Sequence, residues 1–192
     1  MRALAKLERA PGLTLTEVKK PEVGHNDVLI RIRKTAICGT DCHIWKWDEW
    51  AQKTIPVPMQ VGHEYVGEVV DMGTEVRGFE IGDRVSGEGH IGCGHCFFCE
   101  RELYSCCDTT NPNAEEAAKV YGYATAGLFG YSHLTGGYPG GQAEYLRVPY
   151  ADKTHIKVSN GLTDEQVLFL GDIFPTGWQA AVACDIQPTD TV

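Results

Sequence analysis

The hydrophobic and polar positions of this chain alternate over short stretches rather than over long helical periods. Between residues 27 and 37, Val28, Ile30 and Ile32 are separated by mostly charged positions, and this period of two predicts a half-buried strand. Leu29 interrupts the alternation. Further strands are expected where apolar runs are bounded by turn residues, at 2–8, 13–19, 61–72, 78–85 and 142–148. Many short strands with few helices predict a mainly β fold that is partly barrel-like.

Helical signals are fewer and shorter. They occur in a segment after Thr40 and at 113–120, 163–174 and 177–184. Thr40 is expected to cap the first of these helices, and Pro175 is expected to interrupt the helical pattern near the end of the chain. Residues 122–141 are rich in Gly, Tyr and Ser and predict a long loop, which inside a compact domain is usually functional or disordered. The tryptophans at 45, 47 and 50 are expected to pack in the core or line a cleft.

Composition narrows the class of protein. The 192 residues suit one domain or slightly more, and 43% hydrophobic residues are enough to form a core. A net charge of −9 argues against a nucleic-acid-binding surface, which is usually basic. The sequence contains no run of eighteen apolar residues, so it indicates no membrane span, and residues 1–9 do not resemble a signal peptide. We therefore expect a cytoplasmic protein with reduced cysteines.

Half of the eight cysteines form one compact pattern. Cys93, Cys96, Cys99 and Cys107 follow the spacing C-x2-C-x2-C-x7-C, which predicts one tetrahedral Zn²⁺ held by four thiolates. A site closed by four sulfurs has no position for a substrate, so this zinc is expected to be structural. The alternative is a set of unligated or redox-active thiols. The neighbouring Cys106 and His95 are also possible ligands.

A second cluster lies upstream and mixes sulfur, nitrogen and oxygen donors. Cys38 is followed by Thr40 and His43, and the pair His63-Glu64 comes later in the chain. Such a mixed set typically leaves one metal position open for a substrate, and a hydroxyl followed by an imidazole can pass a proton from an alcohol to water. Each of these residues, taken alone, could equally be a packed side chain.

Two further motifs need interpretation. Residues 87–92 match G-x-G-x-x-G, but the zinc cysteines follow where a dinucleotide-binding fold requires a helix, so we interpret the match as coincidental. His90 within it is expected beside an active-site wall. Asp172 lies in an otherwise apolar segment, either as a helix cap or as an oxygen ligand of the upstream metal.

Taken together, these motifs resemble the zinc-dependent medium-chain alcohol dehydrogenases, over essentially the whole chain. The resemblance rests on Cys38-Gly39-Thr40-Asp41, Gly62-His63-Glu64-Tyr65-Val66-Gly67, Gly82-Asp83-Arg84-Val85, the four-cysteine pattern and residues 172–177. Residues 1–91 are most similar to the L-threonine 3-dehydrogenase branch. Residues 93–192 are more similar to the formaldehyde and general alcohol dehydrogenase branch, so a natural mosaic and an assembled hybrid both stay open.

The resemblance implies a GroES-like, partly open β-barrel with short helices and a structural zinc lobe at about 90–110. It implies a catalytic domain at 1–175, and a segment at 176–192 that begins the connection to an absent dinucleotide-binding domain. The complete enzyme would be a cytoplasmic homo-oligomer that uses NAD and acts on a small alcohol or aldehyde, without nucleic acid or membrane.

The resemblance also assigns roles to residues. Cys38 and His63 would bind a catalytic zinc, with Glu64 or Asp172 as the carboxylate ligand. Thr40 and His43 would relay the alcohol proton to solvent, and His90 would lie near the substrate.

The implied function is zinc-assisted hydride transfer from a secondary alcohol, as in L-threonine 3-dehydrogenase. A formaldehyde or primary alcohol dehydrogenase is the alternative within the family, and a non-catalytic zinc-stapled interaction module is the alternative of another class. We expect these 192 residues alone to bind zinc but to turn over no alcohol.

Overall fold

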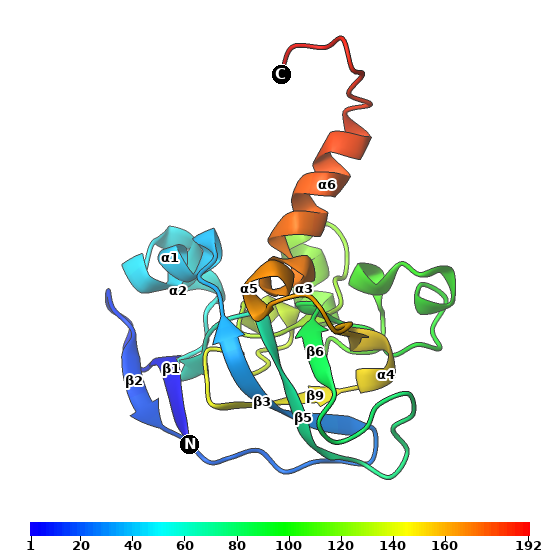
Figure 1. The fold of residues 1–192 in the computed structure, drawn as a ribbon. Coiled ribbons are helices and arrows are strands. Elements are labelled where there is room, and N and C mark those ends of the chain that lie inside the picture. Colours follow the sequence, from blue (N-terminus) through cyan, green and yellow to red (C-terminus); the bar gives the residue numbers. More distant parts are fainter.

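Antiparallel strands form the body of the molecule in a computed structural model that describes all residues 1–192 (Figure 1). The strands are β1 (Arg2–Lys6), β2 (Thr14–Glu17), β3 (Asp27–Thr35), β4 (Met59–Gln60), β5 (Tyr65–Met72), β6 (Arg84–Gly87), β7 (His90–Ile91), β8 (Gly127–Leu128), β9 (Tyr145–Pro149) and β10 (His155–Lys157). They make a five-stranded sheet of order β10-β6-β5-β3-β9, a three-stranded sheet β2-β1-β4 and the pair β7-β8. The sheets do not close into a complete barrel, which agrees with the predicted mainly β, partly open fold.

The main core lies against the five-stranded sheet. Val28 and Ile30 of β3 are fully buried, and they pair with Val148 and Leu146 of β9. The first four residues of β3 are all buried, whereas its second half alternates between exposed and partly buried positions. The irregular position of Leu29 in the sequence pattern therefore marks a part of β3 that is covered on both faces.

The helices are short except for the last one. They are α1 (Gly39–Lys46), α2 (Glu49–Thr54), α3 (Ala114–Tyr121), α4 (Ala151–Thr154), α5 (Asp164–Val167) and α6 (Ile173–Ala183). The predicted helix after Thr40 is confirmed as α1, but the prediction of its cap was wrong. Cys38 occupies the N-cap position, and its backbone N–H donates to Asp41 Oδ2 at 2.9 Å. The sequence pattern did not indicate α2, which Asp48 caps by accepting from the N–H of Ala51 at 3.0 Å.

The strand predicted at 61–72 begins only at Tyr65. Gly62 adopts a left-handed φ of +100°, and a Cβ at this position would collide with the backbone and side chain of Gln142. The chain therefore turns before it enters β5. This turn leaves His63 and Glu64 outside the β-ladder, where their side chains are free to meet residues from other elements.

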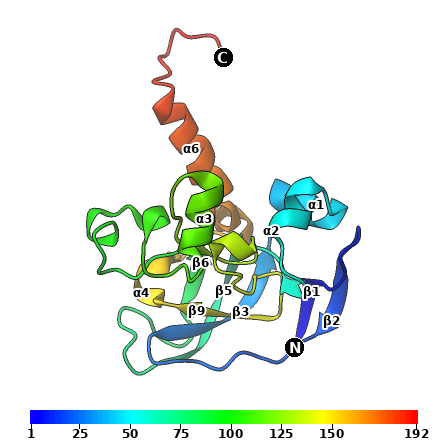
Figure 2. The same ribbon diagram turned by 180° about the vertical axis from the view of Figure 1, so that it is seen from behind.

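The C-terminal helical region breaks earlier than predicted. A 3-10 turn at Leu168–Gly171 follows α5, and Asp172 then adopts an irregular backbone conformation before α6 begins. Pro175 does not interrupt this helix, because it lies in the first turn, where its missing N–H has no intrahelical partner to lose. Helix α6 projects from the body and carries the C-terminus away from it (Figures 1 and 2). None of its residues is buried.

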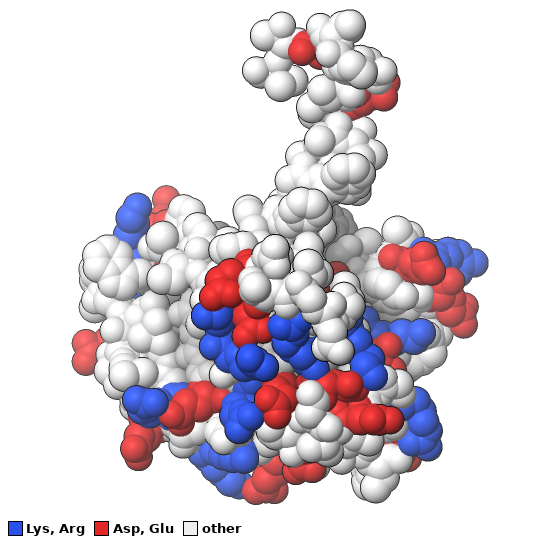
Figure 3. All heavy atoms as spheres, viewed as in Figure 1, with Lys and Arg blue, Asp and Glu red and all other residues white.

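Ion pairs fix α5 to the sheet. Asp164 is almost completely buried and pairs with Arg33 at 2.9 Å and Arg84 at 3.2 Å. Arg84 also donates to the carbonyl of Leu162 at 2.6 Å. The face of the molecule seen in Figure 3 shows basic and acidic side chains interspersed below α6, not a continuous basic patch. The network holds the segment that leads into Asp172.

A neutral histidine in the core predicts acid sensitivity. Nε2 of His155 shares a hydrogen bond of 3.2 Å with the hydroxyl of Tyr65, and burial lowers the pKa of His155 from 6.5 to about 3. Between these two pH values the unfolded chain binds a proton that the folded chain does not, so stability falls as the pH falls from 6.5 towards 3. At pH 4 the loss attributable to this group is about 3 kcal/mol. Denaturant unfolding of wild type and His155→Gln at pH 7 and pH 4 checks this, because the variant should lose less stability than the wild type.

Candidate metal centres

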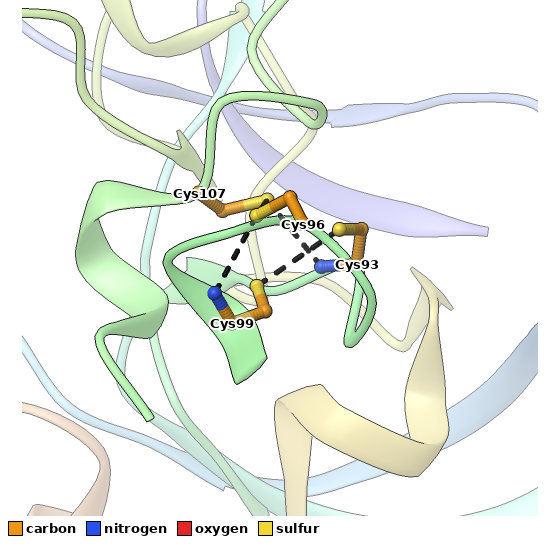
Figure 4. A group of neighbouring side chains, drawn as sticks. All are labelled: Cys93, Cys96, Cys99 and Cys107. Carbon is orange, nitrogen blue, oxygen red and sulfur yellow. Dashed lines mark hydrogen bonds between the residues drawn. The ribbon is translucent and has the colours of Figure 1, made fainter. Parts of the chain in front are cut away.

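Four cysteines converge in the lobe that follows β7. The sulfur of Cys93 lies 3.9 Å from that of Cys99, and the sulfur of Cys96 lies 3.8 Å from that of Cys107 (Figure 4). A zinc ion with four sulfur ligands at about 2.3 Å has sulfur–sulfur edges of about 3.8 Å. The four sulfurs therefore fit the geometry of one tetrahedral metal ion and could bind it.

Backbone groups prepare the lobe for thiolates. Burial would raise the pKa of Cys107, but backbone N–H groups of Thr109 and Cys93 donate to it and lower the pKa overall. Burial raises the pKa of Cys99, because no comparable set of donors compensates there. Cys106 lies outside the cluster, next to the hydroxyl of Ser105. The imidazole of the other possible ligand, His95, is directed to the carbonyl of Cys93 at 3.0 Å.

The second predicted cluster also converges. Cys38, His63, Glu64 and Asp172 each offer one ligand atom, and these four atoms lie within 4.8 Å of one another. The residues come from the start of α1, from the turn before β5 and from the residue before α6, so only folding brings them together. Both carboxylates that the sequence left as alternatives belong to the cluster.

One buried carboxylate oxygen of the donor set has no hydrogen-bond partner, and a metal ion would supply one. Glu64 is 2% exposed and its Oε2 is unpaired, while Nε2 of His63, also 2% exposed, faces Asp172 at 3.2 Å. Buried polar atoms are nearly always paired, so the unpaired oxygen of Glu64 needs an explanation. One sulfur, one imidazole and two carboxylates suit Zn²⁺, and both Cys38 and Asp172 remain partly exposed, so one side of the site is open.

The ionisable groups around His63 shift one another's pKa values. Burial alone would lower the pKa of His63, but hydrogen bonds to Asp172 (3.2 Å) and Cys38 and the charge of Asp41 raise it to about 9. Asp172 has its pKa lowered by the same hydrogen bond to His63. Burial raises the pKa of Glu64, and the charge of Asp172 adds to this effect. A cation at this position would relieve the repulsion between the two carboxylates.

Asp41 is a site residue for which the sequence analysis gave no role. It is 3% exposed, accepts from the N–H of Cys38 at 2.9 Å and from Gln142 Nε2 at 3.0 Å, and carries a charge that acts on His63. Its position in the first turn of α1 was readable from the sequence, but its burial was not. Asp41 therefore positions the backbone of Cys38, and its negative charge favours the protonated form of His63.

Asp172 occupies the N-cap position of α6 without a side-chain hydrogen bond to the backbone of its first turn, and it also belongs to the mixed cluster. It sits at the N-terminus of α6 and accepts from the hydroxyl of Thr176 at 2.9 Å, while its other oxygen reaches His63. Gly171 makes this approach possible, because a Cβ there would collide with the carbonyl of Gly87. Because Gly171 has no side chain, the 3-10 turn that it ends can contact the backbone of β6 directly.

The two residues of the predicted proton relay both lie on α1, but they do not contact each other. Thr40 lies beside the metal cluster, with its hydroxyl 3.9 Å from the sulfur of Cys38. His43 lies one turn further along α1, is exposed, and pairs with Asp48. No hydrogen bond joins Thr40 to His43, so a water molecule or a substrate hydroxyl would have to connect them.

The charges of Asp172 and His63 act on His90, which we predict to lie beside an active-site wall. Burial lowers its pKa, while the charge of Asp172 opposes the effect. Its Nδ1 lies 3.7 Å from Oε1 of Glu88, whose pKa is raised to about 6 by burial and by the charge of Asp172. No helix follows the glycine motif around these residues, because the chain continues into β7 and the cysteine lobe. This agrees with our interpretation that the dinucleotide fingerprint is coincidental.

The long loop predicted at 122–141 is interrupted by β8 and by a 3-10 turn at His133–Thr135, and the stretch between these two elements contacts the cluster. The ring of Tyr131 lies edge-on to that of His63, with centroids 5.8 Å apart. The preceding Gly130 has a φ of +53° and its N–H donates to the carbonyl of Tyr138 at 2.9 Å. A Cβ at Gly130 would lie 2.5 Å from backbone atoms of Gly62. The loop therefore depends on this glycine for its close contact with the turn that carries His63.

Gly130→Ala is expected to destabilise the protein by more than about 2 kcal/mol, because backbone strain and a collision act together. Gly78→Ala is the matched control, since Gly78 also has a positive φ (+79°) but a Cβ added there would meet no atom within 4 Å. The control should cost about 1 kcal/mol. Urea unfolding of both variants measures the difference, and equal losses would contradict the close contact.

None of the helices combines the length and apolar character that a membrane span needs.

The family model described as "Alcohol dehydrogenase GroES-like domain" matches residues 24–159. L-threonine 3-dehydrogenase from Burkholderia vietnamiensis is 56% identical over 172 residues, which are 89% of this chain and 50% of that protein. The chain thus spans about half the length of the curated relatives it matches. An alignment of this length extends well beyond residues 1–91, so this similarity is not confined to the first part of the chain.

Solved structures of alcohol dehydrogenases are also similar to this chain over nearly its whole length. Alcohol dehydrogenase TADH from Thermus sp. ATN1 superposes with a TM-score of 0.81 at 32% identity and covers 99% of this chain and 49% of its own. A protein from E. coli CFT073 described as a short chain alcohol dehydrogenase, complexed with NADH, superposes with a TM-score of 0.67 at 25% identity, and the match covers 100% of this chain and 47% of that one. The chain therefore belongs to the family that carries the alcohol dehydrogenase GroES-like domain.

Proposed function

We propose that residues 1–192 provide the zinc-binding catalytic part of an NAD-dependent alcohol dehydrogenase. The observation that carries the proposal is the convergence of one thiol, one imidazole and two carboxylates within 4.8 Å, on a side of the molecule that stays open. The proposed ligands are Cys38 and His63, with Asp172 or Glu64 as the carboxylate. The lobe of four cysteines would hold a second, structural zinc, giving two per chain.

When bound at the open site, Zn²⁺ supplies Lewis-acid chemistry to an alcohol oxygen. The protein residues around it would bind and move the proton. Thr40 would accept a hydrogen bond from the alcohol hydroxyl, and His43, which is exposed, would pass the proton to solvent. Asp41 would hold the backbone of Cys38 in position, and its negative charge would act on His63.

The hydride would pass to NAD, and we assign no dinucleotide-binding residue within this chain. A structural neighbour complexed with NADH supports the choice of cofactor. We propose that the catalytic domain comprises residues 1–175, and that residues 176–192 begin the connection to a cofactor-binding part. The curated relatives are about twice as long as the stretch they share with this chain, which is compatible with that division.

The relatives favour L-threonine, a secondary alcohol, as substrate. A primary alcohol or formaldehyde is the alternative that the sequence of the second part suggested. The expectations of a homo-oligomer and of a cytoplasmic location stay proposals that rest on the family resemblance.

Metal analysis separates this enzyme from a zinc-stapled interaction module. The purified chain, refolded with zinc and dialysed, should contain two zinc ions, and Cys38→Ser should contain one. One zinc in the wild type, lost in Cys107→Ser but retained in Cys38→Ser, would indicate the interaction module. Turnover is then tested with L-threonine, ethanol and formaldehyde on a chain extended through a cofactor domain. Absence of NAD reduction with every alcohol would contradict the enzymatic role.

A further inference from the structure

Gln142 is a buried residue at which three segments of the chain meet, and two of these segments carry candidate metal ligands. Its backbone N–H donates to the carbonyl of Val61 at 3.0 Å, and its carbonyl accepts from the N–H of Leu4 in β1 at 2.8 Å. The residue is 7% exposed. These backbone bonds fix the position of Gln142 independently of its side chain.

The side-chain amide of Gln142 connects two points on either side of Cys38. Its Nε2 donates to the carbonyl of Ala36 at 3.2 Å and to Oδ2 of Asp41 at 3.0 Å. An amide nitrogen carries two hydrogens, so both are used in these bonds. The same Oδ2 of Asp41 also accepts from the backbone N–H of Cys38 at 2.9 Å. The amide therefore holds the stretch of backbone that presents the sulfur of Cys38.

The hydrocarbon part of Gln142 packs against the turn that presents His63. Gly62 precedes His63, and a Cβ added at Gly62 would lie 2.4 Å from Cγ of Gln142. The N–H of the neighbouring Gly141 donates to the carbonyl of Gly62 at 2.8 Å, which keeps the two segments together. One buried side chain thus contacts both the segment of the sulfur ligand and the segment of the nitrogen ligand.

A neutral donor is the chemical type that this position requires. The carbonyl of Ala36 and the carboxylate of Asp41 are both acceptors, so an apolar side chain at 142 would leave each of them without this donor, and a carboxylate would repel them. Neither change would remove the backbone bonds to Val61 and Leu4. Substitutions at 142 therefore separate the contacts with the ligand segments from the contacts that hold the sheets together.

We propose that Gln142 is a positioning residue of the open metal site, which holds Cys38 and His63 at the separation that one metal ion needs. Gln142 is not itself one of the four ligand residues, so it acts through Asp41, through the carbonyl of Ala36 and through the turn at Gly62. This inference rests on the proposed function, because it requires a metal ion at Cys38 and His63.

The test compares the two metal sites within one molecule. Gln142→Met keeps the length and most of the volume of the side chain but removes the donor. The zinc affinity of each site is measured by competition with a chelator. Loading with Co²⁺ identifies the site that changes, because four thiolates and a single thiolate give different absorption spectra. The lobe of four cysteines serves as the internal reference, since Gln142 contacts none of its residues.

Gln142→Met should weaken zinc at the open site about 10–100-fold, the usual range for loss of a group that orients a metal ligand, and leave the affinity of the lobe unchanged. Gln142→Glu has the same shape but turns an acceptor towards two acceptors. It should weaken the open site at least as much, and it is the second variant if Gln142→Met does not fold. Gln60→Met is the matched control, because Gln60 lies on β4 outside both metal clusters, and it should leave both affinities unchanged.

A double substitution tests the route through Asp41. In an Asp41→Asn background, the effect of Gln142→Met on the open site should be at least about threefold smaller than in the wild type, because residues of one hydrogen-bond network do not act independently. Equal effects in the two backgrounds would contradict this route.

Two further results overturn the inference while leaving the proposed function intact. One is a Gln142→Met protein that is less stable in urea but binds zinc at the open site as tightly as the wild type. The other is an equal loss of affinity at both sites, which would show a general structural role. A wild-type chain that binds no metal ion at Cys38 would overturn the inference together with the proposed function.

Discussion

His63→Ala is expected to remove the metal ion from the open site and to abolish dehydrogenase activity. The imidazole is 2% exposed and pairs with Asp172 at 3.2 Å, so its removal takes away the one nitrogen ligand of the cluster and a partner of the Asp172 carboxylate. The zinc content should fall from two ions per chain to one. Turnover of an extended chain that carries a cofactor domain should fall by at least about a thousandfold, since the loss removes the Lewis acid itself.

His25→Ala provides the control for this experiment. His25 is an exposed histidine whose side chain lies outside both metal clusters, so the zinc content and the turnover should be unchanged. A His63→Ala protein that still held two zinc ions would place the catalytic metal elsewhere. A protein that lost both ions would show that His63 is required for folding of the whole domain, and Cys38→Ser would then be needed to isolate the open site.

Cys107→Ser is expected to release the other metal ion and to unfold the cysteine lobe. Cys107 is 0% exposed, and its sulfur accepts from the N–H of Cys93 at 3.4 Å, so it links the two ends of the lobe. The apolar residues packed in this cluster are few, among them Ala126 and the partly buried Tyr104, so a bound metal ion would supply most of the cohesion. Structural zinc sites of this kind contribute apparent binding energies of about 10 kcal/mol or more.

The measurements are zinc content and limited proteolysis. Cys107→Ser should contain one zinc ion, still bound at Cys38, and should be cut within residues 93–107 at protease concentrations that leave the wild type intact. Cys106→Ser is the matched control, because its side chain lies next to Cys107 in sequence but outside the cluster. If Cys106→Ser lost the zinc and Cys107→Ser retained it, the assignment of the fourth ligand would be reversed.

The strand pattern and the cysteine lobe could be predicted because both are local properties. Alternation in Val28, Ile30 and Ile32 reports which side of one strand meets the core, whatever the neighbouring strands are. The spacing of the four cysteines confines their sulfurs to one short stretch of chain, so a shared metal ion needs little help from the rest of the fold. The zinc lobe was therefore the prediction with the strongest support in the sequence.

The cap of α1 and the start of α6 could not be predicted with the same accuracy. Thr40 is a good capping residue by type, but Asp41 reaches back to the N–H of Cys38 and makes Cys38 the cap. Pro175 signals a break, yet the break falls at Asp172, because Gly171 must fit against Gly87. Both outcomes depend on contacts between segments, and a pattern of residue types does not contain them.

The sequence alone determined which kinds of ligand this protein offers: a closed set of four thiolates, and a mixed set drawn from Cys38, His63, Glu64 and Asp172. Only the tertiary structure decided that the mixed set meets in one place, that Asp41 supports it, and that the ring of Tyr131 packs edge-on against His63. The physical reason is distance along the chain. Residues 38, 63, 131 and 172 belong to separate elements, and the packing of the sheet, the glycine contacts and the ion pairs of α5 bring them together.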